Sequence, residues 1–253
     1  GNIRSSVLGY EDRDPDKKEL TNMEAELRDA MESGAFGMSS GLVYPSGCYA
    51  KTPELIALCK IVNQYNGIYA THIRNEGDEI EAALSETVNI ALTSSVRTLI
   101  SHIKTWGQQN WGKIGWIEEL LNDARSKGTE ISCDRYPYIA SATDLDIILP
   151  NWVYEGGVTE ERKKLKDPLT RERIVKDMVQ GTERPGFWES IMISSVFNEK
   201  KKQYEGMTVA EIAKTLKMPP LEFVLDLLCE EECKVSALFF SMSEENLDKI
   251  LNW

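Results

Sequence analysis

The chain has 253 residues, of which 42% are hydrophobic and 28% charged, a balance typical of one large globular domain. Its formal net charge of −12 argues against nucleic-acid binding, because that function needs a basic surface. No stretch approaches the run of about 18 apolar residues that spans a membrane, so we expect no membrane contact.

The first part of the chain alternates amphipathic helices with short strand-like runs. The apolar spacing predicts a first helix that begins at Thr21, where Glu24 completes a capping box, and ends before Gly34. Strands are predicted at 35–42, 68–73, 97–103 and 130–134, and further helices at 52–66, 78–92 and 110–127. This order of strand, helix and strand predicts βα units and a parallel sheet.

The alternation breaks after about Thr143, where proline and glycine become frequent. We expect three parts: residues 1–143 form βα units of a barrel, 144–234 form an insertion subdomain, and 235–253 return to the barrel as a strand and a helix. The fold class is therefore α/β, a partial (β/α)8 barrel of the TIM type. Since eight strands are needed to close a barrel, the chain is either a piece of a larger barrel or has sheet edges covered by another chain or a different fold.

The chain contains two histidines, His72 and His102, and each stands at the C-terminal end of a predicted strand. Consecutive strand ends of a parallel barrel converge on one cavity. Two imidazoles in one cavity indicate a metal site, with zinc the commonest metal for such ligands. The alternative is that the two are unrelated, one capping a helix and the other buried and neutral.

Three further polar residues lie near strand ends: Lys104 follows His102 by two residues, Tyr136 is at the end of the next predicted strand, and Ser141 is in the loop after it. Together with two imidazoles, they could hold a substrate carboxylate beside a metal. Two alternatives stay open at this stage. Lys104 could be solvated, and Tyr136 could be a buried tyrosine with a satisfied hydroxyl group.

Carboxylates also occur near the strand ends. Asp134 ends the fourth predicted strand, and we expect it to cap or orient a histidine rather than to contact substrate. Glu76 and Asp78 are expected to begin the following helix, where negative charge suits the helix dipole.

Several segments in order along nearly the whole chain resemble the N-acyl-D-amino-acid deacylases (D-aminoacylases) of the amidohydrolase superfamily; they are residues 23–27, 34–45, 71–76, 101–104, 134–138 and 206–213. The resemblance implies a zinc hydrolase that removes the acyl group from a small N-acyl-D-amino acid. It matches His72 and His102 to the metal-binding histidines of the fifth and sixth barrel strands. It matches Lys104, Tyr136 and Ser141 to residues that hold the substrate's carboxylate.

Other features of the family have no counterpart here. The family takes a His-x-His pair from its first strand, a metal-ligating cysteine from an early strand, and a catalytic aspartate from its last strand, followed by an arginine. Cys48 follows a later strand and does not take the cysteine's role. We therefore expect a segment covering about strands 4 to 7, with the catalytic residue unknown within this chain.

Two other functions stay open: an amidohydrolase acting on a cyclic amide or imide, and a non-catalytic barrel fragment. Self-association could cover the open sheet edges of such a fragment. The five cysteines, an odd number at irregular spacing, indicate reduced thiols and a cytoplasmic protein.

Overall fold

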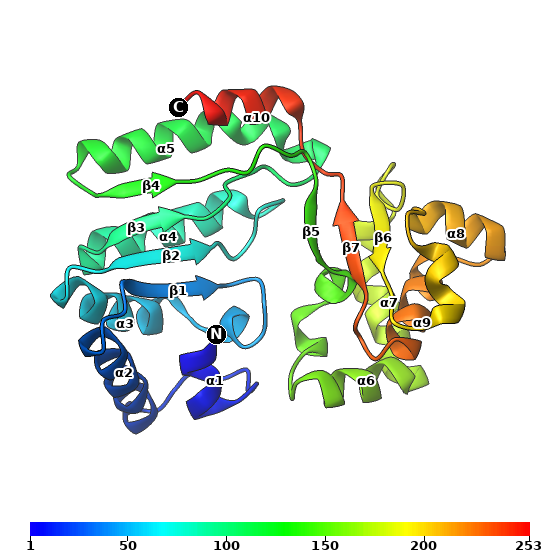
Figure 1. Cartoon of the computed structure of the whole chain (residues 1–253), viewed down its shortest axis with the longest axis horizontal. Coiled ribbons are helices and arrows are strands. Elements are labelled where there is room, and N and C mark those ends of the chain that lie inside the picture. The colour runs from blue at the N-terminus through cyan, green and yellow to red at the C-terminus, as the bar shows by residue number, and fades with distance from the viewer. The chain divides into compact units, whose positions relative to one another are not determined.

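The computed structural model describes all residues from 1 to 253, and the chain divides into two compact units (Figure 1). The first comprises residues 1–137 and 242–253, and the second comprises residues 138–241. The second unit thus extends beyond both ends of the insertion expected at 144–234.

A four-stranded sheet forms the centre of the first unit. Its strands are β1 (Gly37–Gly41), β2 (Ile68–His72), β3 (Arg97–Ile100) and β4 (Ile131–Cys133), which lie in chain order with every neighbouring pair parallel. The helices α3 (Thr52–Gln64), α4 (Ile80–Ser94) and α5 (Ile114–Ser126) connect successive strands, and α2 (Lys17–Glu32) precedes the sheet. The α/β class with a parallel sheet is therefore confirmed.

The first unit also contains α1 (Asn2–Leu8), the short 3-10 helices η1 (Gly47–Tyr49) and η2 (Gln108–Lys113), and the C-terminal α10 (Glu244–Leu251). The predicted start of the first helix at Thr21 is wrong. Helix α2 begins four residues earlier, because Asp16 and Glu19 form a complete capping box. Thr21 lies inside this helix, and its hydroxyl donates to the Lys17 carbonyl.

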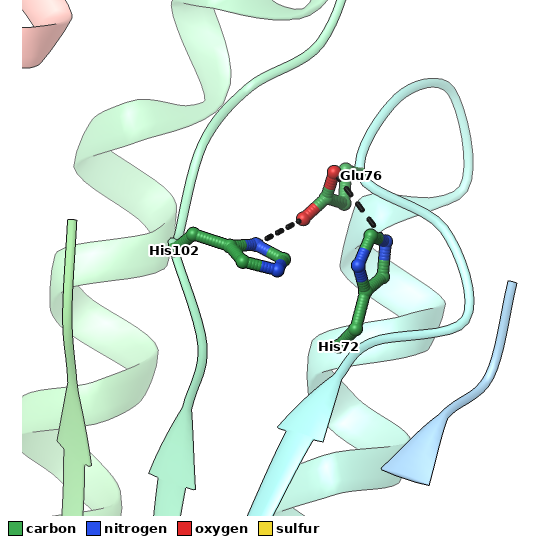
Figure 2. Close-up of side chains that lie close together, drawn as sticks. All are labelled: His72, Glu76 and His102. Atoms are coloured by element: carbon green, nitrogen blue, oxygen red, sulfur yellow. Dashed lines mark hydrogen bonds and ion pairs between the residues drawn. The ribbon is translucent and has the colours of Figure 1, made fainter. Parts of the chain in front are cut away.

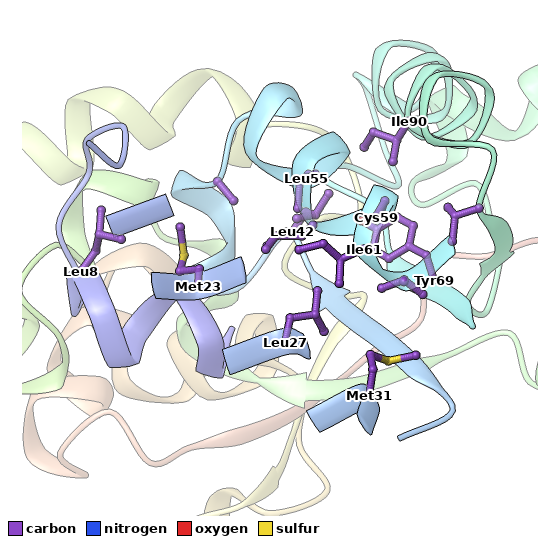
Figure 3. Packing of buried hydrophobic residues seen from close by; sticks show 14 residues of the cluster. Leu8, Met23, Leu27, Met31, Leu42, Leu55, Cys59, Ile61, Tyr69 and Ile90 are labelled. Atoms are coloured by element: carbon purple, nitrogen blue, oxygen red, sulfur yellow. The ribbon is translucent and has the colours of Figure 1, made fainter. Parts of the chain in front are cut away.

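Two clusters of buried apolar side chains hold the strands and helices of the first unit together. The cluster in Figure 3 draws on α1, α2, α3 and β2 and includes Met23, Leu27, Cys59 and Tyr69. The second draws on α4, β3, α5, β4 and α10, the last through Ile250. Both clusters pack against β2 or β3, so they fix the two strands that carry the histidines.

The second unit contains a three-stranded antiparallel sheet of β5 (Ser141–Asp144), β6 (Ile191–Ser195) and β7 (Ser236–Phe239), in the order β5-β7-β6. Its helices are α6 (Val158–Lys166), α7 (Pro168–Thr182), α8 (Val209–Leu216) and α9 (Pro220–Glu230), with 3-10 helices η3 (Leu145–Ile148), η4 (Asn151–Val153) and η5 (Glu199–Tyr204). No helix in either unit combines the length and the apolar composition that crossing a membrane requires.

The strand expected to return to the parallel sheet behaves differently. We predicted a strand at 235–240 in the barrel, but β7 pairs antiparallel with both β5 and β6. Its alternating burial, with Ala237 and Phe239 buried, suits a sheet covered on one face. The helix that follows, α10, does lie in the first unit.

Candidate metal centre

The two histidines lie at adjacent strand ends of the parallel sheet. His72 is the last residue of β2, and His102 follows the end of β3 by two residues. Their ring centroids are 4.5 Å apart with an interplanar angle of 74°. Each histidine is followed by a buried isoleucine, Ile73 or Ile103, which anchors the chain beside the ring. The geometry excludes the alternative that the two histidines are unrelated.

Glu76 completes a cluster with the two imidazoles (Figure 2). Its Oε2 lies 3.6 Å from His72 Nε2, and its Oε1 lies 3.2 Å from His102 Nδ1. One ligand atom from each of these three residues lies within 4.8 Å of the others. Two imidazole nitrogens and one carboxylate oxygen are donor types that zinc accepts, so the residues fit the metal that the sequence suggested.

The expectation that Glu76 begins a helix is wrong, because α4 begins at Ile80. Asn75 supplies the hydrogen bonds at the start of that segment: its Oδ1 accepts from the backbone N–H groups of Gly77 and Glu79, at 2.8 and 3.2 Å. Glu76 is therefore free to turn toward the strand ends. No sequence signal separates this role from that of a carboxylate that begins a helix.

Lys104 also joins this cluster. Its Nζ lies 2.5 Å from Glu76 Oε1 and 2.7 Å from His102 Nδ1. The residue is 3% exposed, which excludes the alternative of a solvated lysine. The lysine ammonium thus contacts two of the three residues that could hold a cation.

The rings of two tyrosines lie beside the imidazoles. Tyr136 has its ring centroid 6.1 Å from that of His102, and Lys104 Nζ lies 5.5 Å from the Tyr136 centroid. Tyr44, which the sequence reasoning did not single out, has its ring 5.3 Å from that of His72. Ser141 begins β5 in the second unit.

The charges in the cluster stabilise one another. Burial opposes ionisation of Glu76, but the hydrogen bond from His102 and the charge of Lys104 outweigh it and lower the Glu76 pKa to about 2. Burial lowers the pKa of His72 to about 4 and also lowers the pKa of Lys104. At neutral pH, therefore, Glu76 is a carboxylate and His72 is a neutral imidazole, the forms that bind a metal ion.

His102 Nδ1 faces both an acceptor and a donor. In one tautomer it donates to Glu76, and in the other it accepts from Lys104. In the first tautomer Nε2 keeps its lone pair for a metal ion, and the carboxylate orients the ring. Glu76 can thus serve the centre either by binding the ion or by selecting this tautomer.

Comparisons with known proteins agree with this chemistry. No family model matches the chain. The chain is 38% identical over 143 residues to a D-aminoacylase of Alcaligenes xylosoxydans xylosoxydans, covering 56% of this chain and 29% of the relative. It is 36% identical over 144 residues to an N-acyl-D-glutamate deacylase of the same organism, covering 57% and 30%.

The structure resembles an N-acyl-D-glutamate deacylase from Bordetella bronchiseptica, solved with zinc and a phosphonate that mimics the tetrahedral intermediate. The TM-score is 0.77 at 25% identity, over 100% of this chain and 44% of the deacylase. The resemblance to the D-aminoacylases is thereby confirmed in sequence and in structure. The matched region spans less than a third of the length of the two curated relatives.

Proposed function

We propose that this chain forms part of the catalytic barrel of a zinc-dependent hydrolase that removes the acyl group from N-acyl-D-amino acids. The observation that carries the proposal is the cluster of His72, Glu76 and His102 at the ends of neighbouring parallel strands. The similarity to D-aminoacylases supports the same reaction. In this proposal β1 to β4 correspond to about strands 4 to 7 of a (β/α)8 barrel.

His72 and His102 are the proposed metal ligands, with Glu76 as the nearest carboxylate. When bound, zinc supplies Lewis acidity at the amide carbonyl of the substrate. The carboxylate charge of Glu76 would offset the positive charges of Lys104 and of a metal ion held by the imidazoles. The catalytic aspartate that the resemblance implies is assigned to no residue of this chain.

Lys104, Tyr136 and Ser141 are the proposed groups that hold the substrate's α-carboxylate. The Lys104 ammonium supplies an ion pair and a charge-assisted hydrogen bond. Burial raises the pKa of Tyr136, so its phenol stays protonated and can donate to a carboxylate. Ser141 is included on the resemblance alone, as a further hydroxyl donor.

The test measures amide hydrolysis by the natural polypeptide that contains these 253 residues. The substrates are N-acetyl-D-glutamate, N-acetyl-D-methionine, their L-enantiomers, and the cyclic amides hydantoin and dihydrouracil. Release of the free D-amino acid, lost in His102→Ala and retained in the control Cys229→Ser, supports the proposal. Hydrolysis of the cyclic amides alone would replace it with the cyclic-amide alternative, and hydrolysis of none of them would leave a non-catalytic fragment.

We also infer that the chain functions in the cytoplasm. All five cysteines are free thiols in the structure, including the buried Cys48, Cys59 and Cys233. Unpaired thiols of this number are typical of a reducing compartment. Cell fractionation with a tagged protein tests the inference, which recovery outside the cytoplasm would contradict.

We infer that the edges of the parallel sheet are covered by other polypeptide. β1 and β4 each pair on one side, so each presents an edge of backbone N–H and C=O groups. The isolated 253-residue chain should therefore self-associate as its concentration rises. Sedimentation at several concentrations tests this, and a monomer throughout would contradict it.

A further inference from the structure

His102 has an unusual backbone conformation. Its φ angle is +43°, in the left-handed region that residues with a Cβ atom adopt at an energetic cost. The two isoleucines on either side, Ile100 and Ile103, are both almost completely buried. The chain therefore makes a sharp turn at His102 between two fixed points.

Asp134 holds this turn through three hydrogen bonds. Its backbone N–H donates to Ile100 O at 3.1 Å, and its carbonyl accepts from Ile103 N–H at 2.9 Å. Its side-chain Oδ1 accepts from the backbone N–H of His102. The first two bonds continue the pairing of β3 with β4. The third depends on the Asp134 side chain, because its carboxylate is close enough to the backbone to accept from a neighbouring N–H group.

We propose that Asp134 is a positioning residue whose carboxylate holds the His102 backbone in the left-handed turn that directs its imidazole toward His72 and Glu76. This inference rests on the proposed function, since it concerns a proposed metal ligand. Without the acceptor, the buried isoleucines still hold the chain on both sides, but the His102 N–H loses its partner. The residue relaxes toward an ordinary φ, and its ring leaves the cluster.

The inference separates geometry from charge. Asp134→Asn keeps an acceptor oxygen at the same place and removes the charge, whereas Asp134→Glu keeps the charge and moves the acceptor by one methylene. Positioning predicts that the Asn variant retains the centre and that the Glu and Ala variants lose it. A purely electrostatic contribution predicts that Glu is tolerated and Asn is not.

The experiment titrates Co²⁺ into the 253-residue chain and follows its visible absorption. Asp134→Ala and Asp134→Glu should weaken Co²⁺ binding by about 10- to 100-fold, as expected for residues that orient a ligand, and Asp134→Asn by less than about threefold. Asp123→Ala is the matched control, because Asp123 is an exposed aspartate paired with Lys127 on α5. Retained binding in the Glu variant, or loss in the Asn variant, would overturn the inference.

A second measurement does not depend on the metal. Because the chain has two histidines, the long-range ¹H–¹⁵N spectrum of the metal-free protein resolves both imidazoles. Asp134→Glu should shift the signals of the His102 nitrogens, whereas Asp134→Asn should leave them close to their wild-type positions. An unchanged His102 signal in the Glu variant also contradicts positioning. If wild type and His102→Ala bind Co²⁺ equally, the proposed metal site fails, while the spectra still decide the role of Asp134.

Discussion

The ammonium of Lys104 lies 2.5 Å from the carboxylate of Glu76, and both groups adjoin His102. The lysine side chain is 2% exposed and the glutamate side chain 14%, so the pair is largely removed from water. The charge of Lys104 helps to lower the pKa of Glu76, while the charge of Glu76 opposes the lowering of the Lys104 pKa by burial. Glu76 attracts a cation between the imidazoles, while Lys104 repels it, and the two substitutions should therefore change metal affinity in opposite directions.

Glu76→Gln should weaken Zn²⁺ binding to the chain by at least about tenfold, because it removes the negative charge and one ligand oxygen. Lys104→Met should strengthen binding by a similar factor, since it removes a positive charge from the ligands. Isothermal titration at fixed ionic strength measures both constants. Lys127→Met, which removes an exposed lysine just after the end of α5, is the control and should have no effect. A weaker affinity in Lys104→Met would show that the lysine orients the ligands instead of repelling the ion.

Lys104→Met should also raise KM for N-acyl-D-amino acids by at least about tenfold, because the ion pair to the substrate carboxylate is lost. Substrates that lack this carboxylate, such as N-acetylated amines, should show the same KM in both proteins. Steady-state kinetics on the natural polypeptide that contains this chain compares the two substrate classes. An equal KM for the carboxylated substrate would remove Lys104 from the substrate site.

The strand ends with their histidines could be predicted because parallel strands bring their C-terminal ends to one edge. Glu76 could not, because a carboxylate just before a predicted helix usually stabilises the helix dipole. The side chain of Asn75 supplied those hydrogen bonds instead, and a sequence does not show which of two neighbouring side chains will do so. The position of Glu76 is thus set by tertiary contacts, which local sequence does not show.

Two fold predictions failed for related reasons. The Thr21 and Glu24 pair and the Asp16 and Glu19 pair both have capping-box spacing, and the helix uses the earlier pair because residues 17–20 also favour a helix. The strand at 235–240 was recognised, but a short apolar run looks the same in a parallel and in an antiparallel sheet. Its partners β5 and β6 are distant in the sequence, so local pattern could not choose the sheet.

Arg74 should fix the loop that carries Tyr44. Its guanidinium donates to the carbonyls of Cys48 and Ala50 at 2.8 and 2.7 Å, and it pairs with Glu86 of α4 at 2.9 Å. Lysine cannot make these contacts together, so Arg74→Lys should increase hydrogen exchange in residues 43–51 by about tenfold. Mass spectrometry of the peptides that cover this loop measures the change.

The matched control for Arg74 is Arg28→Lys, because Arg28 donates to the side chain of Gln64 at an exposed site. This control should leave exchange in residues 43–51 unchanged. Equal exchange in wild type and Arg74→Lys would show that the loop is held by its apolar contacts, such as buried Ala50 and Leu42.

The second unit should lose stability as the pH rises from about 4.5 to about 7. Glu161 of α6 is 2% exposed, and its Oε1 has no hydrogen-bond partner. Burial, together with the charge of Asp146, raises the pKa of Glu161 to about 7. The folded chain thus keeps this proton up to about pH 7, whereas the unfolded chain releases it near 4.5. The contribution of Glu161 to stability is full below about pH 4.5 and decreases up to about pH 7, by on the order of 2 kcal/mol.

Glu161→Gln removes this titration and should flatten the pH dependence of the free energy of unfolding between pH 5 and pH 7. The pH dependence that remains is due to Asp146, because burial raises its pKa to about 6. The protein is equilibrated in urea at each pH and then labelled by a deuterium pulse at one fixed pH, so that exchange in α6 reports the unfolded fraction. Glu160→Gln, the neighbouring exposed residue paired with Lys163, is the control and should keep the wild-type slope. A wild-type slope in Glu161→Gln would show that the folded and unfolded chains release this proton at the same pH, and that water reaches the Glu161 carboxylate despite its burial.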